Sequence, residues 1–79
     1  MKGDKVIVRS FGDKPLVRMV WEITSSAVFI CTEENFSALS RGNNGLWPVG
    51  FPKECVYRYN PKINLNAPIV WDQLTVYGN

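Results

Sequence analysis

The segment from residue 17 to residue 24 alternates between two sets of side chains more regularly than any other part of the chain. One set is entirely apolar and consists of Val17, Met19, Trp21 and Ile23. The other set is mostly polar and consists of Arg18, Val20, Glu22 and Thr24. Because successive side chains of a strand point to opposite faces of a sheet, this period of two predicts a β-strand with the apolar set in the core.

A second β-rich segment, residues 27–32, follows after the dipeptide Ser25-Ser26, and together the two segments predict an antiparallel hairpin with a two-residue loop. In that register Ile23 pairs with Val28 and Trp21 pairs with Ile30, so the large apolar side chains share one face. The outer face then carries an apolar patch made of Val20, Phe29 and Cys31. We expect something to cover this patch, because large exposed apolar patches mark interaction sites.

Shorter signals predict three more strands around this hairpin. Residues 6–8 are β-branched and stand between turn residues, residues 47–51 form a short strand that Pro48 makes an edge or a bulge, and residues 56–59 form a closing strand. Residues 52–55 fit a single helical turn. Residues 33–46 predict an extended loop, in which residues 35–39 could form a helical turn. Because five strands and no long helix are predicted, the chain as a whole is expected to be all-β.

The chain divides at Asn60-Pro61 into a five-stranded barrel, residues 1–60, and an apolar tail, residues 61–79. The tail contains Trp71 and Tyr77 and is too hydrophobic to be a solvated linker. We expect it to pack across the outer patch of the hairpin, either on its own chain or on a neighbouring copy. Val20, Phe29, Trp71 and Tyr77 are therefore the predicted interface residues.

Two short motifs resemble the small barrels of the Src-homology-3-like class: Lys-Gly-Asp-Lys-Val-Ile-Val at positions 2–8 and Gly-Phe-Pro-Lys-Glu-Cys-Val at positions 50–56. They are similar to the opening strand of such barrels and to the turn before their closing strand. The resemblance implies a five-stranded barrel. The peptide-binding members would also have an acidic specificity loop and paired tryptophans. Residues 11–15 are too few for that loop and Trp21 stands apart from Trp47, so the proline-rich ligand is not carried over.

Composition argues against catalysis, because the 79 residues include no histidine and only scattered carboxylates. No metal-ligand spacing or phosphate-binding glycine motif is present, so neither a metal nor a cofactor is expected. Cys31 and Cys55 stand in apolar strings and are expected to be reduced, structural thiols. The first residues are too polar for a signal peptide, which favours a cytoplasmic protein without a membrane segment.

Nucleic-acid binding is one open alternative. The candidate residues gather near the first two predicted strands and are Lys5, Arg9, Phe11, Lys14 and Arg18. Acidic neighbours dilute this charge, and the net charge of the whole chain is only +2. Binding to nucleic acid is therefore the second choice.

The favoured function is that of a non-catalytic interaction module that binds a protein partner or forms a homo-oligomer, because the chain combines an uncovered apolar patch, an apolar tail and many aromatic residues. The predicted binding surface consists of Arg41, Asn43, Asn44, Trp47, Tyr57 and Tyr59. A third alternative is a small-ligand groove between Trp47, Phe51 and Tyr57 beside the loop of residues 41–45.

Overall fold

The computed structural model describes residues 2–9, 12, 14–42 and 46–77. Its strands are β1 (Lys5–Arg9), β2 (Pro15–Ile23), β3 (Ala27–Cys31), β4 (Val49–Pro52) and β5 (Val56–Arg58). It also contains one α-helix, α1 (Glu33–Ser40), and two 3₁₀ turns, η1 (Lys53–Cys55) and η2 (Val70–Gln73). None of the helices in these described ranges is both long and apolar enough to cross a membrane.

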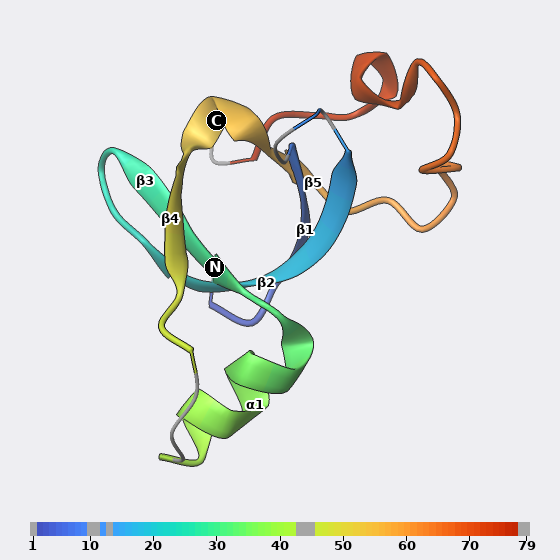
Figure 1. Cartoon of the computed structure of the whole chain (residues 1–79). Helices are drawn as coiled ribbons and strands as arrows, with labels where there is room; N and C mark the ends of the chain where they lie inside the picture. Colours follow the sequence, from blue (N-terminus) through green and yellow to red (C-terminus); the bar gives the residue numbers. More distant parts are fainter. Residues whose placement is uncertain (1, 10–11, 13, 43–45, 78–79) are drawn as a thin grey trace.

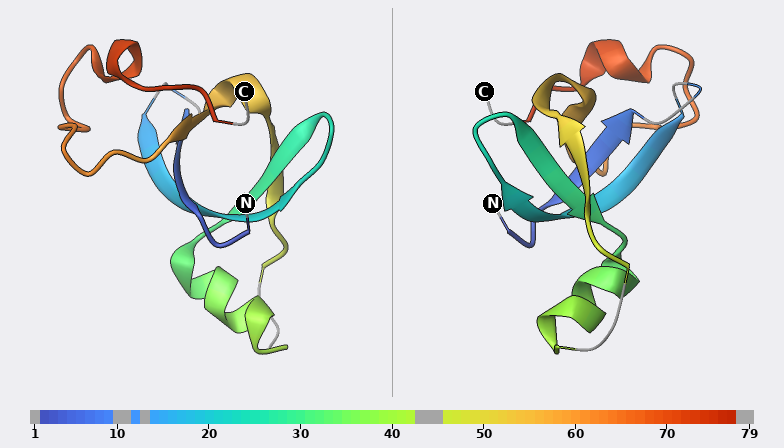
Figure 2. Two further views of the ribbon diagram at one scale, coloured as in Figure 1. Left: turned by 180° about the vertical axis from the view of Figure 1, so that it is seen from behind. Right: turned by 60° about the vertical axis from the view of Figure 1, so that its left-hand side comes forward.

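The five strands form one antiparallel sheet in the order β4-β3-β2-β1-β5, which confirms the all-β prediction. The sheet curves strongly, so that β4 and β5, the two ends of the order, lie near each other and are joined only by η1 (Figures 1 and 2). The tight turn between β2 and β3 and the single turn before β5 are also as predicted. The fold is therefore a small barrel of the kind that the sequence resemblance implied.

The core of the barrel is built from β-branched side chains that the curved sheet turns inward. These are Val6, Val8, Val20, Val28, Ile30 and Val56, joined by Tyr77 from the tail, with Phe51 packed against them. Six valines and isoleucines fill the small interior because their stiff, branched side chains pack well on a pleated surface. The core thus depends on all five strands and on the end of the chain.

The predicted core face of β2 is wrong: Val17, Met19 and Trp21 are only half-buried, and Ile23 is 38% exposed. The register between β2 and β3 shifts between Val20 and Glu22, as at a β-bulge, so Val20 pairs with Ile30 and Met19 pairs with Cys31. The predicted pairing of Ile23 with Val28 is confirmed. An extra residue in one strand exchanges the two faces on either side of it. Val20, which was predicted on the outer patch, is therefore fully buried in the core.

Helix α1 takes up the first part of the loop predicted for residues 33–46 and extends the helical turn predicted over 35–39, and it covers the outer side of β2. The Thr32 hydroxyl caps the helix by accepting a hydrogen bond from the Asn35 backbone N–H at 3.1 Å. Phe36 of the helix packs edge-on against Trp21, with 5.6 Å between the ring centroids. The Lys2 ammonium lies 3.7 Å from the centroid of the same Trp21 ring. Trp21 was predicted in the core, but it belongs to this outer layer.

Phe29, the second residue of the predicted outer patch, is covered by β4. Phe29 pairs with Gly50, and a Cβ atom added at Gly50 would come within 3.0 Å of the Phe29 ring. Only glycine leaves room for the ring to lie against the strand. None of the three residues of the predicted outer patch is therefore left open: Val20 lies in the core, Phe29 packs on Gly50, and Cys31 is buried beside the pocket.

The tail packs on its own chain, but at β5 and not on the hairpin as predicted. Val76 forms a bridge with Tyr57, and the Tyr77 backbone N–H donates to Val56 O at 2.7 Å. Tyr57 packs against Trp71 with 4.9 Å between centroids. In Figure 1 the tail, coloured orange to red, lies on the side of β1 and β5, away from the β2–β3 turn. Aromatic stacking and strand-like bonds hold it there.

Trp71 and Tyr77, two of the predicted interface residues, are used inside this tail packing. Trp71 is half-buried against Tyr57, and the Arg9 guanidinium lies 5.0 Å from the centroid of its indole ring. Tyr77 is only 6% exposed, and its hydroxyl donates to Asp4 Oδ2 at 3.1 Å. Both residues stabilise the barrel, and Tyr77 offers almost no surface to a partner.

The bulge can be tested by comparing Val20→Ala with Val17→Ala. Val20→Ala removes buried carbon from the core and is expected to lower the free energy of unfolding by about 2 kcal/mol. Val17→Ala makes the same change at a half-buried position of the other face, so it should cost less than about 1 kcal/mol. Urea denaturation measures both values. A larger loss for Val17→Ala would contradict the register described above.

Candidate binding site

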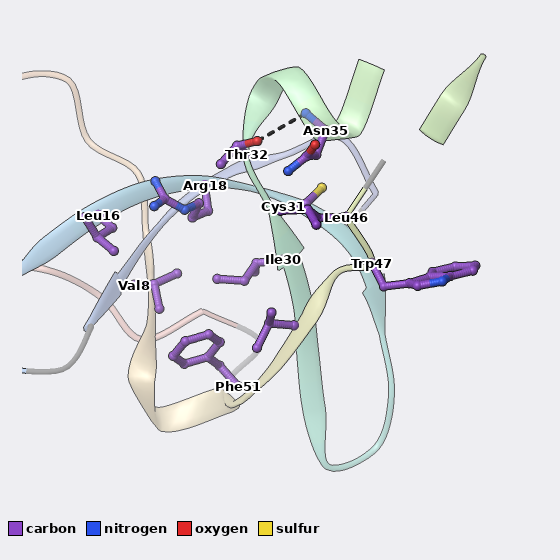
Figure 3. Close-up of a pocket in the computed structure, with 11 residues that line it drawn as sticks. Val8, Leu16, Arg18, Ile30, Cys31, Thr32, Asn35, Leu46, Trp47 and Phe51 are labelled. Atoms are coloured by element: carbon purple, nitrogen blue, oxygen red, sulfur yellow. Dashed lines mark hydrogen bonds between the residues drawn. The ribbon is translucent and has the colours of Figure 1, made fainter. Parts of the chain in front are cut away.

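A pocket of about 280 Å³ opens on one side of the barrel, between β4, the start of β2 and the beginning of α1. Its lining is mostly apolar, as the close-up in Figure 3 shows. The lining residues are Val8, Leu16, Arg18, Ile30, Cys31, Thr32, Asn35, Leu46, Trp47, Val49 and Phe51. The pocket is continuous with the core because Val8 and Ile30 belong to both.

The alternation of β4 explains why this side is apolar. Val49 pairs with Ile30 and Phe51 pairs with Val28, so both β4 side chains lie on the same side of the sheet as two core residues. The strand is short, and the backbone before it is irregular from Leu46 to Pro48. No other described strand pairs with β4 beyond β3, so the interior is left open here.

Three large apolar side chains at the rim are exposed to solvent. Leu46 is 75% exposed, Trp47 is 80% exposed and Val49 is 59% exposed. Figure 3 shows the Trp47 ring pointing away from Val8 and Ile30, so it stands beside the pocket and does not close it. We call these three residues the apolar rim. Tryptophan is enriched at the energetic centres of protein interfaces, and exposed apolar patches mark binding surfaces.

Arg18 is the only charged residue among the described residues that line the pocket. Its side chain is half-buried, and Nη1 donates to Val17 O at 2.8 Å. A guanidinium carries five N–H donors in a planar fork, which suits a carboxylate. The pocket therefore combines an apolar floor with one fixed cation, an arrangement that favours an apolar group with an anionic neighbour.

A second, polar groove lies at the other edge of the sheet, beside β5. It has a volume of about 310 Å³ and is lined by Asp4, Lys5, Arg58, Tyr59 and Tyr77. The Lys5 ammonium lies 5.8 Å from the Tyr59 ring centroid, and the Arg58 guanidinium lies 5.6 Å from that of Tyr77. Two cations and a partly exposed tyrosine make this groove electropositive and aromatic.

The structure does not bring the predicted binding residues together. Trp47 stands at the apolar rim, and Arg41 is exposed at the end of α1. Tyr59 lies in the polar groove. Tyr57 is only 7% exposed, and its hydroxyl accepts a hydrogen bond from Arg9 Nη2 at 2.7 Å, so it is a packing residue. The other two predicted residues, Asn43 and Asn44, lie outside the described residues.

The predicted nucleic-acid residues are also separated. Lys5 belongs to the polar groove, whereas Arg9 packs against Tyr57 and Trp71, and Arg18 lines the apolar pocket. Lys14 is exposed before β2, and Phe11 lies outside the described residues. The four basic residues that lie close together in the sequence, Lys5, Arg9, Lys14 and Arg18, are therefore distributed over different surfaces of the fold.

Sequence reasoning placed only Trp47 and Phe51 of the lining residues at a groove, and among those it did not assign to a pocket are Leu46, Val49 and Arg18, the last of which it had named only for nucleic acid. The signal for Leu46 was available, because the apolar pair Leu46-Trp47 follows the run of glycine and asparagine at residues 42–45. An apolar residue directly after a polar loop, in front of a proline-interrupted strand, is a candidate surface anchor. Arg18 had no such signal, since it was assigned to an ordinary wet strand face.

The chain matches no protein-family model, and it matches neither a curated protein nor a solved structure. The class of protein is thus defined by the fold and the surface described above: a small antiparallel barrel with an apolar pocket and an exposed apolar rim. Function must be argued from those residues, because a small barrel by itself supports many functions.

Cys31 provides a test of the pocket. Burial raises the pKa of the Cys31 thiol, so less reactive thiolate is present at neutral pH than for an ordinary cysteine. In a Cys55→Ser variant, we expect iodoacetamide to modify Cys31 slowly at pH 7.5 and faster as the pH rises. Mass spectrometry measures the rate. Modification at the rate of a free thiol in water would contradict the burial of this part of the pocket.

Proposed function

We propose that this chain is a non-catalytic, cytoplasmic interaction module that binds a protein through the pocket and its apolar rim. The observation that carries the proposal is the joint exposure of Leu46, Trp47 and Val49 beside an open pocket. Fully burying side chains of this size is worth about 1.5–3 kcal/mol each. Burial of three of them on one rim would favour the binding of a partner.

The size of the pocket favours a protein side chain over a larger free ligand. Pockets that enclose drug-sized molecules have volumes of roughly 300–1,000 Å³. At about 280 Å³ this pocket falls at the lower limit of that range. An aliphatic or aromatic side chain of a partner fits such a volume. The apolar rim would then pack around the inserted side chain and exclude water from the centre of the interface.

The chemistry of the pocket supports a binding role. The chain has no histidine, and burial raises the pKa of the Cys31 thiol, the one thiol among the described lining residues, so less of its reactive thiolate is present at neutral pH. Both cysteines are free thiols, which suits the reducing environment of the cytoplasm.

Site-specific crosslinking tests the proposed function. A photoreactive benzoylphenylalanine at position 47 is expected to give covalent protein adducts in extracts of the native host. The same group at position 62, in the tail and away from the rim, serves as the control, because Lys62 is also exposed. Equal labelling at both positions, or none at position 47, would remove the basis for an interaction module.

Binding to single-stranded nucleic acid is a second candidate function, favoured by the polar groove and not by the pocket. Tyr59 is 38% exposed, so its ring can accept a stacked base, while Lys5 and Arg58 lie in the same groove to attract phosphates. Asp4 reduces the local positive charge, which explains why this candidate takes second place.

Fluorescence polarisation with a labelled oligothymidine measures this second candidate. At low salt we expect binding that weakens by about tenfold or more when the salt concentration rises from about 50 to 200 mM. Tyr59→Ala is expected to weaken it further by about tenfold through the loss of stacking. Trp47→Ala should have no effect. A polarisation signal that is absent at low salt, or that depends on Trp47 and not on Tyr59, would reject the groove as the site.

A further inference from the structure

The tail presents a surface that complements the pocket. Ile69 is 58% exposed, and Asp72 is exposed one turn later, where its backbone N–H donates to Ile69 O at 3.1 Å. Side chains three residues apart in a 3₁₀ turn lie on the same side. Because Ile69 is the N-cap residue of η2, we expect its exposed side chain and the exposed Asp72 carboxylate to lie on the same side of this turn. We call these two residues the tail turn.

We propose that the tail turn of one copy of the chain occupies the pocket of a second copy. Ile69 would enter the apolar pocket, and the Asp72 carboxylate would meet the guanidinium of Arg18. This inference rests on the proposed function, since it uses the same pocket, and it names the partner. The pairing satisfies both properties of the site, because the apolar lining receives a branched side chain and the only described charge of the lining receives the opposite charge.

The two surfaces lie on different sides of the molecule, so a single chain cannot satisfy its own pocket in this way. In both Figure 1 and Figure 2, the tail that carries η2 lies on the side of β1 and β5, and α1 lies on another side of the barrel. The pocket is lined by Thr32 and Asn35 at the beginning of α1. A contact between two different surfaces of identical copies is heterologous, and it propagates into a ring or an open chain of subunits.

Side-chain insertion suits this edge of the sheet better than strand addition does. β4 is an edge strand of only four residues, and prolines stand before it at Pro48 and at its end at Pro52. Short edges and prolines discourage the pairing of a further strand. The exposed groups near β4 that can bind are therefore the side chains of the pocket and rim.

The contact should be weak. A standard stable interface buries about 800 Å² on each partner. That is roughly one seventh of the 5352 Å² surface of this chain, and one turn in one pocket covers less. We therefore expect self-association in the micromolar to millimolar range, visible as a sedimentation coefficient that rises with protein concentration.

Charge reversal tests this proposal. Arg18→Asp alone and Asp72→Arg alone each place like charges in the contact, so each variant should sediment as a monomer and associate at least tenfold more weakly than the wild type. An equimolar mixture of the two should associate again, because every contact between the two variants pairs opposite charges. Glu54→Arg, a reversal of an exposed carboxylate outside the contact, is the matched control and should behave as the wild type does.

Two further variants keep the test decisive if Arg18→Asp does not fold. Arg18→Met removes the charge and retains an apolar lining, and Ile69→Ser removes the inserted side chain; each should weaken association. A wild type that remains monomeric up to millimolar concentration, or an Asp72→Arg variant that associates as the wild type does, would overturn the proposal. If position 47 then still crosslinked to a different protein, the interaction function would stand and only its partner would change.

Discussion

Both faces of this small sheet carry apolar side chains, and the need to cover them determines the rest of the structure. The curvature of the sheet buries its inner face, because it brings valines from four strands into contact. The outer face cannot do this and requires other segments. Helix α1 covers β2 through Phe36 on Trp21, and the tail covers β1 and β5 through Trp71 on Tyr57. A chain of 79 residues needs both covers because a single small core gives only marginal stability.

The sequence predicted the five strands and the central hairpin because their signals are local. Alternation, a two-residue turn and a proline before the last turn each lie within a few residues of the chain. The face of β2 was harder to predict. Val17 and Met19 compete with Val20 for the core, and the shift at Trp21 that decides between them leaves no mark on the pattern. The helix was predicted only as a turn over residues 35–39, because its serine and asparagine residues are typical of loops, although Thr32 was a good cap.

The candidate site could be predicted only in part, for a reason that follows from those errors. Trp47 was found because it stands beside a polar loop, where an aromatic residue is conspicuous. Tyr57 was misplaced because its exposure depends on Trp71, a residue from a segment whose docking position no local pattern specifies. Arg18 became a pocket residue only when the bulge turned its side of β2 inward. Sites made where distant segments meet require the fold first.

The pairing of Val76 with Tyr57 has a consequence for the way in which this protein avoids misassembly. A barrel that does not close has two free borders, and each is a template on which another chain can lay down a strand. Here the border at β4 carries prolines, whereas residues 75–77 of the same chain occupy the border at β5. Proteolytic removal of these residues would therefore do more than destabilise the barrel. It would expose the unpaired N–H and C=O groups of β5, on which other chains could add strands and aggregate.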